Sequence, residues 1–206
     1  MLADLLFPPV CLGCRRLLRA DLLLPLCTAC ARDQPPLPAA VRHQGGVEAL
    51  HAYEGPLARA VAALKYRGDV ELAGPLGRLL ARAEALQRPW DRLAPVPMHP
   101  WRAVLRGYNH AALLARWAAH HARQPRPEPR LLRRLRATPP QAGQGAAARR
   151  HNLDGAIGVR LPVAGLRVLV LDDVTTTGAT LGACLAALRD AGAAEVAGLA
   201  LLRTLP

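Results

Sequence analysis

The sequence predicts an α/β domain with a central, mostly parallel β-sheet flanked by helices, preceded by a small cysteine-rich module. Three observations lead to this fold class. From Val47 onward, candidate strands and helices alternate, as in chains built of βαβ units. The candidate strand RVLVLDD at 167–173 is continuously apolar up to its two acids, which is typical of a parallel strand covered on both faces. Four of the five cysteines lie within residues 1–33, a stretch with almost no periodicity.

The chain divides into three predicted parts. Residues 1–33 form the cysteine module, 34–46 a linker rich in Pro and Gly, and 47–206 the α/β domain. The 206 residues suit one domain of about 150 residues plus a small module. No apolar run reaches the roughly 18 residues that suggest a transmembrane helix. The N-terminus has no basic start, and prolines interrupt its apolar run, so we expect no signal peptide and a cytoplasmic protein.

The elements of the domain follow from the spacing of its apolar residues. A short strand is expected at 47–53 and a buried strand, ending in prolines, at 92–97. Helical spacing predicts helices over 56–66, 70–86 and 109–122. The Pro-rich, basic segment 123–130 is a predicted turn, and 138–147, which lacks an apolar period, an exposed loop.

The C-terminal third has the clearest pattern. The strand at 167–173 is followed by a helix over 178–192, closed by Gly192, and by a strand at 195–202. A strand, a helix and a second strand joined by a tight first turn form a right-handed βαβ unit.

Two adjacent acids, Asp172 and Asp173, end the 167–173 strand, and a loop of Thr and Gly leads from them into the helix. Ligands of open α/β sheets bind at this end of the strands, and the free amides of a helix N-terminus suit a phosphate. We therefore expect the acids to accept from vicinal ribose hydroxyls and the loop to hold a phosphate. The loop residues are Thr175, Thr176, Thr177, Gly178, Ala179 and Thr180. Helix capping is the alternative, but it needs only one acid and one threonine.

This segment resembles the phosphoribosyl-diphosphate (PRPP) motif of type I phosphoribosyltransferases, and nearly the whole chain resembles the competence protein ComF family. The matching pieces occur in family order. They are the paired N-terminal cysteines, YEGPLARAVAALKYRGD at 53–69, PVPMHPWRAVLRGYNHA at 95–111, TPPQAGQGAAARRHNLDGAI at 138–157, and the PRPP motif itself. The resemblance implies a type I phosphoribosyltransferase fold that binds PRPP, with Mg²⁺ neutralising the pyrophosphate group.

The resemblance also implies roles for two other stretches. The loop after the 92–97 strand would hold pyrophosphate through the backbone near Met98 and His99, with Arg102 or Arg106 nearby; surface charge is the alternative for these arginines. The 138–157 stretch resembles a lid that closes over PRPP and excludes water. Its matching residues are Gln141, Arg149 and Asn152. A loop without a role is the alternative.

The chain departs from the family pattern at a few positions. It has His110 where Gln is usual, Ile157 where Phe is usual and Gln144 where Leu is usual. It also lacks a further cysteine pair between the first four cysteines and the domain. These departures leave the PRPP motif intact and concern the second substrate and the size of the metal module.

The N-terminal cysteines form two CxxC pairs separated by 12 residues, which fits tetrahedral Zn(Cys)₄ geometry. The predicted ligands are Cys11, Cys14, Cys27 and Cys30. A cytoplasmic compartment argues against disulfides, so we expect a structural zinc ion; a disulfide or free thiols are the alternatives. Cys184 shares a helical face with three leucines and is expected in the core.

Lys65 is the single lysine of the chain and ends an apolar helix just before Arg67. It either points its charge at the PRPP site or caps the helix C-terminus, and the sequence leaves both roles open.

The formal net charge of +12 invites a nucleic-acid partner, although GC-rich codons would also enrich arginine. A basic strip precedes the candidate lid, opposed by Glu128 alone, and should attract the phosphates of single-stranded DNA. Its members are Arg123, Arg126, Arg130, Arg133, Arg134 and Arg136. Only Trp101, Tyr108 and Trp117 near the basic stretches could stack on bases.

Two functions remain open. The resemblance implies a PRPP-binding protein of natural transformation that handles incoming single-stranded DNA, together with a helicase-like partner at the inner face of the membrane. The alternative is an active phosphoribosyltransferase that transfers the phosphoribosyl group to an unidentified nucleobase or amine.

Overall fold

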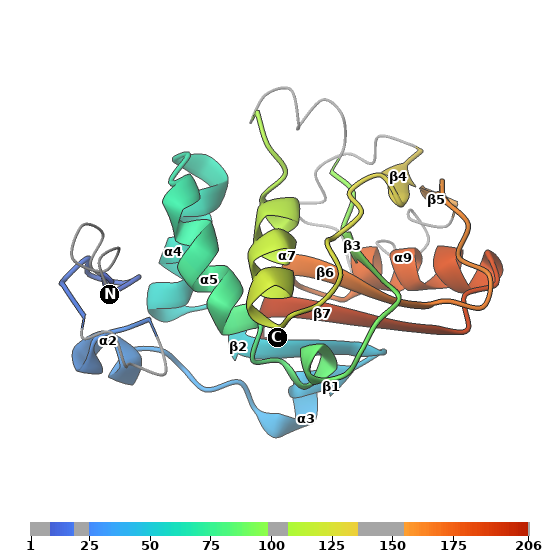
Figure 1. Cartoon of the computed structure of the whole chain (residues 1–206). Helices are drawn as coiled ribbons and strands as arrows, with labels where there is room; N and C mark the ends of the chain where they lie inside the picture. The colour runs from blue at the N-terminus through green and yellow to red at the C-terminus, as the bar shows by residue number, and fades with distance from the viewer. Residues whose placement is uncertain (1–8, 19–24, 99–106, 136–154, 206) are drawn as a thin grey trace.

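The computed structural model describes residues 9–18, 25–98, 107–135 and 155–205. Its centre is a five-stranded sheet in the order β1-β2-β7-β6-β3 (Figure 1). The strands are β1 (His43–Gln44), β2 (Val47–Ala52), β3 (Arg92–Pro95), β6 (Arg167–Thr175) and β7 (Glu195–Arg203). Strands β2, β7, β6 and β3 are parallel, and β1 pairs antiparallel with β2. The predicted mostly parallel sheet is therefore confirmed.

Helices cover both faces of this sheet. Helices α4 (Gly55–Tyr66), α5 (Ala73–Leu80) and α7 (His110–His121) lie on one face, and α9 (Ala179–Asp190) lies on the other (Figure 1). Alternate residues of β6 divide between the two layers, because successive side chains of a strand point to opposite faces. Leu169 and Leu171 pack with the α4, α5 and α7 layer, whereas Val168 and Val170 pack with α9.

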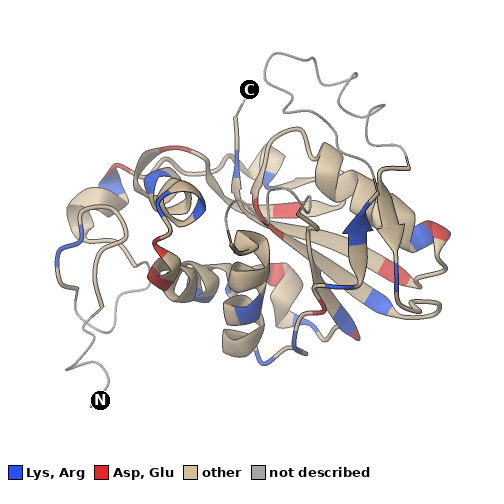
Figure 2. Ribbon diagram, turned by 90° about the horizontal axis from the view of Figure 1, so that it is seen from above, with Lys and Arg blue, Asp and Glu red and all other residues tan. Residues whose placement is uncertain are grey.

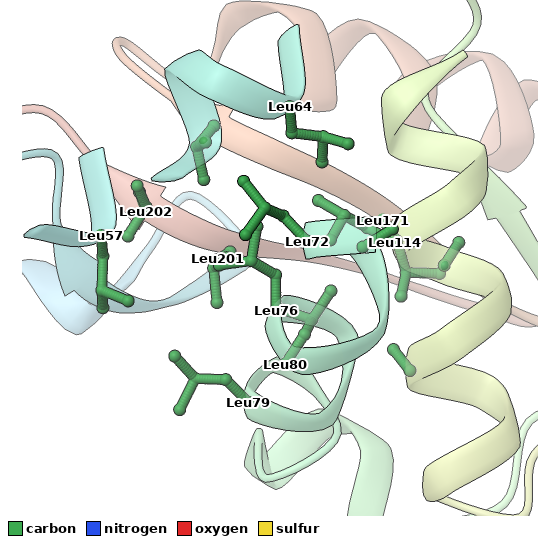
Figure 3. Packing of buried hydrophobic residues seen from close by; sticks show 14 of the residues in the cluster. Leu57, Leu64, Leu72, Leu76, Leu79, Leu80, Leu114, Leu171, Leu201 and Leu202 are labelled. Atoms are coloured by element: carbon green, nitrogen blue, oxygen red, sulfur yellow. The ribbon is translucent and has the colours of Figure 1, made fainter. Parts of the chain in front are cut away.

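The α4, α5 and α7 layer is built mainly from leucine. Figure 3 shows Leu64 of α4, Leu76 and Leu80 of α5, and Leu114 of α7 beside Leu171 of β6. Helices α5 and α7 approach closely at Gly77, where an added Cβ would clash with the Cβ of Trp117. A larger residue at this position would push the two helices apart.

The predicted helix over 70–86 forms three pieces in the structure: η1 (Val70–Leu72), α5, and η2 (Glu84–Gln87). A contact from a distant strand accounts for the second interruption. The buried carboxylate of Glu48 in β2 accepts from the backbone N–H of Glu84 at 3.1 Å and of Ala85 at 2.8 Å. These two amides at the start of η2 bond to Glu48 of β2 and not to carbonyls of α5, so α5 does not continue into η2. The prediction of a single long helix was therefore wrong.

Several short elements were not predicted. Helix α2 (Thr28–Arg32) belongs to the cysteine module, and α3 (Ala39–Arg42) and β1 lie within the predicted linker. Strands β4 (Leu132–Arg134) and β5 (Ile157–Val159) form a separate antiparallel pair. These elements are too short to produce a recognisable period. No helix in the described part of the chain has the length and hydropathy of a membrane span.

Candidate functional site

A cavity of about 170 Å³ lies at the carboxyl ends of β3 and β6, where ligands of parallel sheets bind. Of the predicted site residues, the structure brings Met98, Asp172, Asp173 and Thr180 to this cavity. The remaining lining residues are Lys65, Val96, Pro97, Asn109, His110, Ala111, Arg134 and Val174. The cavity therefore joins the two acids, the end of the proline-rich strand and the first turn of α9.

The two acids lie within strand β6, which continues to Thr175, and not in the loop after it. As neighbours on a strand they point to opposite faces of the sheet. Asp173 is only 1% exposed and points to the α4 and α7 layer. Its Oδ1 lies 2.9 Å from Lys65 Nζ, and its Oδ2 lies 3.1 Å from His110 Nε2. Asp173 is thus held between two basic side chains, and Asp172 faces the other layer.

The structure resolves the role of Lys65, which reaches from the last turn of α4 to the carboxylate of Asp173. Burial acts to lower the pKa of Lys65, but the charge and hydrogen bond of Asp173 outweigh it, and the pKa is raised. The hydroxyl of Tyr108 donates to the carbonyl of Leu64, which fixes this end of α4 against the start of α7. Lys65 is therefore a charged, partly buried residue of the cavity lining.

Asp172 is partly exposed in the cavity and sits on the α9 side of the sheet. Burial and then the negative charge of Asp173 raise its pKa well above the ordinary value, against the opposing effect of Lys65. The backbone N–H of Asp173 donates to Asp172 Oδ1 at 2.9 Å. Cys184 of α9 is buried as predicted, and its pKa is raised by burial and by the charge of Asp172.

The loop after β6 changes from buried to exposed along its length. Thr175 ends the strand and is buried, whereas Thr176 and Thr177 are exposed. Gly178 adopts a φ of 76°, the left-handed region that favours glycine, and is the N-cap residue of α9. Thr177 Oγ1 accepts from the N–H of Ala179 at 3.4 Å, and the first turn of α9 carries no acid. The helix N-terminus therefore keeps its attraction for an anion.

Asn109 connects the start of α7 to the end of β3. Its side chain accepts from the N–H of Ala112 at 3.3 Å, which caps α7, and donates to the carbonyl of Val96 at 3.3 Å. Asn109 is thus a structural support of the cavity.

Several predicted site residues fall outside the described residues. They are His99, Arg102 and Arg106 of the candidate pyrophosphate loop, and Gln141, Arg149 and Asn152 of the candidate lid. Arg134 was assigned only to the basic strip, yet it lines the cavity with both acids. Its position in β4, opposite Ile157 of β5, carried no sequence signal because both strands have three residues.

The four N-terminal cysteines come together in a second candidate site. The sulfurs of Cys11, Cys14, Cys27 and Cys30 all lie within 4.8 Å of one another. Cys14 Sγ and Cys27 Sγ are 3.6 Å apart, close to the ~3.8 Å that tetrahedral zinc with Zn–S bonds of ~2.3 Å requires. An added Cβ at Gly13 would lie 2.7 Å from Cys30 Sγ, so the first loop fits closely around the sulfurs. This cluster could hold a structural metal such as zinc.

The cysteine cluster is docked on the domain. Cys11 and Cys30 belong to the same core as Leu57 of α4. Arg15, just after the first cysteine pair, bonds Asp69 at 2.9 Å in the turn that follows α4. A metal at this cluster would therefore order a surface that packs against the helix carrying Lys65.

Basic residues are spread over many elements of the fold, including β4 (Figure 2). Within the predicted strip, Arg123, Arg126, Arg130 and Arg133 are exposed and form no ion pair with a described residue. Arg136 lies outside the described residues. The described strip thus consists of exposed cations, and the segment that carries them leads to Arg134 at the cavity.

Comparisons with known proteins give a consistent group of relatives. No protein-family model matches the chain. It is 34% identical over 186 residues to the DNA utilization protein YhgH of Salmonella typhimurium, covering 87% of this chain and 78% of that protein. The protein of the same name from Escherichia coli K12 is 35% identical over 164 residues, covering 74% and 70%. Competence protein F of Haemophilus influenzae is 30% identical over 154 residues, covering 70% and 66%.

Proposed function

The chain belongs to the competence protein ComF family, and on this premise we propose that it acts in DNA uptake as a PRPP-binding protein with a type I phosphoribosyltransferase fold. Its task would be to handle incoming single-stranded DNA, with a helicase-like protein as partner. The names of the relatives support the DNA-related role. The observation that carries PRPP binding is the convergence of Asp172, Lys65 and the N-terminus of α9 at one cavity.

Each part of the cavity suits one part of PRPP. Asp172, partly exposed at the cavity, would accept from the ribose hydroxyls. The N–H groups and hydroxyls of residues 175–180 would bind the 5-phosphate at the start of α9. The pyrophosphate would lie toward Met98 and Arg134, and Mg²⁺ bound with PRPP would neutralise part of its charge.

Asp173 has a different part in this proposal. Its Oδ1 lies against Lys65 and the residue is almost fully buried, so it is less available to a sugar hydroxyl than Asp172. It would instead keep Lys65 charged beside the ribose and hold α4 and α7 in place against β6. We therefore assign sugar binding to Asp172 and a positioning role to Asp173.

Calorimetry with PRPP and Mg²⁺ tests the assignment. Asp172→Asn preserves the shape of the side chain and removes its charge, and we expect PRPP to bind at least about tenfold more weakly. Asp190→Asn, an exposed acid at the far end of α9, is the matched control and should bind as the parent does. Equal affinity of the parent and Asp172→Asn would reject the sugar-binding role.

The DNA role has a separate test. Arg130 and Arg133 are exposed and do not line the cavity. The double variant Arg130→Glu/Arg133→Glu should bind single-stranded DNA more weakly and with a smaller salt dependence. PRPP binding should stay unchanged. Arg134 is kept intact because it lines the cavity and its replacement would disturb both ligands.

An active phosphoribosyltransferase remains the second candidate, favoured by the raised pKa of Asp172, which burial and the charge of Asp173 produce. A carboxyl with a raised pKa suits proton transfer near neutral pH. In such a reaction an acceptor nitrogen would bond to the anomeric carbon, pyrophosphate would leave, and the acceptor proton would pass to a base. PRPP-dependent release of pyrophosphate, screened over nucleobases and amines, tests this candidate.

A further inference from the structure

A second cavity, of about 280 Å³, lies beside the candidate PRPP cavity. Asn109 lines both, so the two share a wall at the start of α7. The apolar part of the second cavity is formed by Tyr108 and Leu113 on one side and Pro127 and Pro129 on the other. It is small for a ligand pocket, which suits one flat group better than an extended ligand. We call this cavity the α7 groove.

Two arginines complete the lining of the α7 groove. Arg116 comes from α7 and Arg126 from the segment between α7 and β4. Both are exposed, and the side chain of neither makes an ion pair or hydrogen bond with a described residue. Other arginines are engaged: Arg167, for example, bonds Asp91 through two of its nitrogens. The groove therefore presents an apolar surface between two available positive charges.

This combination matches the repeating unit of a single nucleic-acid strand, in which an unstacked base alternates with phosphates. Bases bind by stacking and apolar contact, while phosphates bind to arginine side chains. A duplex keeps its bases stacked inside and would offer the groove only phosphates. The segment that carries Arg126 continues to Arg130 and Arg133, which extend the positive surface beyond the groove.

We propose that the α7 groove binds one nucleotide unit of single-stranded DNA, with the base against Tyr108, Leu113 and Pro127 and the flanking phosphates on Arg116 and Arg126. The proposal rests on the DNA-handling role given above and adds the site. Because Asn109 borders both cavities, the bound strand would pass directly beside the PRPP cavity.

The charge part of the proposal is tested by fluorescence anisotropy with a labelled oligothymidylate. In the double variant Arg116→Glu/Arg126→Glu, binding should weaken by at least about tenfold. The slope of log K against log salt concentration should become about 1.4 less steep, because two phosphate contacts are lost and each contributes ~0.7. The matched control is Arg59→Glu/Arg82→Glu, which makes the same charge change at exposed arginines outside the groove. The control should bind within about twofold of the parent.

The base part is tested with an abasic deoxyribose-phosphate strand of equal length. The parent should prefer oligothymidylate by about tenfold, because stacking of each base contributes about 1–3 kcal/mol. Ala112→Trp fills the groove from α7 and should abolish this preference while keeping affinity for the abasic strand. Leu113→Ser, which removes apolar surface without adding volume, is the second variant and should reduce the preference. Urea denaturation verifies that each variant is folded.

Four results would overturn the proposal. Equal losses in the groove and control double variants would mean that net charge alone attracts DNA. A parent that binds both strands equally would show that the groove holds no base. If calorimetry finds that free thymine or adenine binds to the parent but not to Ala112→Trp, and DNA binding is the same in both, the groove would be a pocket for the nucleobase acceptor of a phosphoribosyl transfer. If the parent binds no single strand even at low salt, the DNA role itself fails, whereas PRPP calorimetry remains independent of these outcomes.

Discussion

Replacing Lys65 with Met tests whether the buried pair with Asp173 holds the site together. The substitution keeps an unbranched side chain and removes the ammonium group that lies 2.9 Å from Asp173 Oδ1. Asp173 would then remain buried beside Asp172 with one basic neighbour fewer. Removing one partner of a buried pair costs about 3–5 kcal/mol. We expect about 3 kcal/mol, because the Lys65 side chain is 14% exposed and His110 still contacts Asp173.

Urea denaturation at pH 7 measures this loss as a lower midpoint with an unchanged slope. Arg67→Met is the control, because Arg67 follows the same helix, is exposed and forms no ion pair with a described residue; it should change stability by less than about 0.5 kcal/mol. The double variant Lys65→Met/Asp173→Asn removes the stranded charge and should recover at least half of the loss. A Lys65→Met variant as stable as Arg67→Met would refute the reasoning.

The pH dependence gives an independent check on the same pair. The folded-state pKa of Lys65 is raised above its ordinary value of 10.5 by the charge of Asp173, after the opposing effect of burial. A raised pKa contributes stability that is fully present below the unfolded pKa and is lost as pH rises through the folded pKa. The difference in unfolding free energy between the parent and Lys65→Met should therefore stay constant from about pH 6 to 9 and narrow above about pH 10.

Three further predictions follow from the site and its supports. Asp172→Asn should be about 1 kcal/mol more stable than the parent at pH 7. Burial and the charge of Asp173 raise the pKa of Asp172, so the stability that this carboxyl contributes to the parent at low pH is lost as pH rises through its folded-state pKa. Urea titrations of the two proteins should therefore find no difference in unfolding free energy near pH 4. Glu48→Ala leaves two partly buried amides of η2 without acceptors and should cost about 2 kcal/mol, with Glu84→Ala, at an exposed side chain, as control. Metal analysis should find about one zinc per chain, and chelation should lower the thermal midpoint of unfolding. Cys14→Ser should lower both the zinc content and this midpoint, whereas a disulfide at these cysteines would contradict the zinc site.

The sequence by itself determined the βαβ unit around residues 167–203. A continuous apolar strand, a loop of Thr and Gly, and a helical period are local patterns, and each favours the same structure as the tertiary contacts around it. The start of α7 at Asn109 was likewise predictable, because the cap that forms there joins residues three positions apart. The close approach of four cysteines follows from two short, regular spacings.

Only the tertiary structure decided which residues surround the acids. Lys65 and Asp173 are far apart in sequence, and their pairing depends on how α4 packs on β6. The separation of Asp172 and Asp173 onto opposite faces depends on β6 continuing to Thr175, which the pairing of Thr175 with Arg203 of β7 fixes. Glu48 interrupts the helical period at 84 through hydrogen bonds from another strand. Local sequence patterns predict the periods of helices and strands. The ends of these elements and the partners of buried charges depend instead on contacts between distant segments, and the free energy of such contacts cannot be read from a short stretch of sequence.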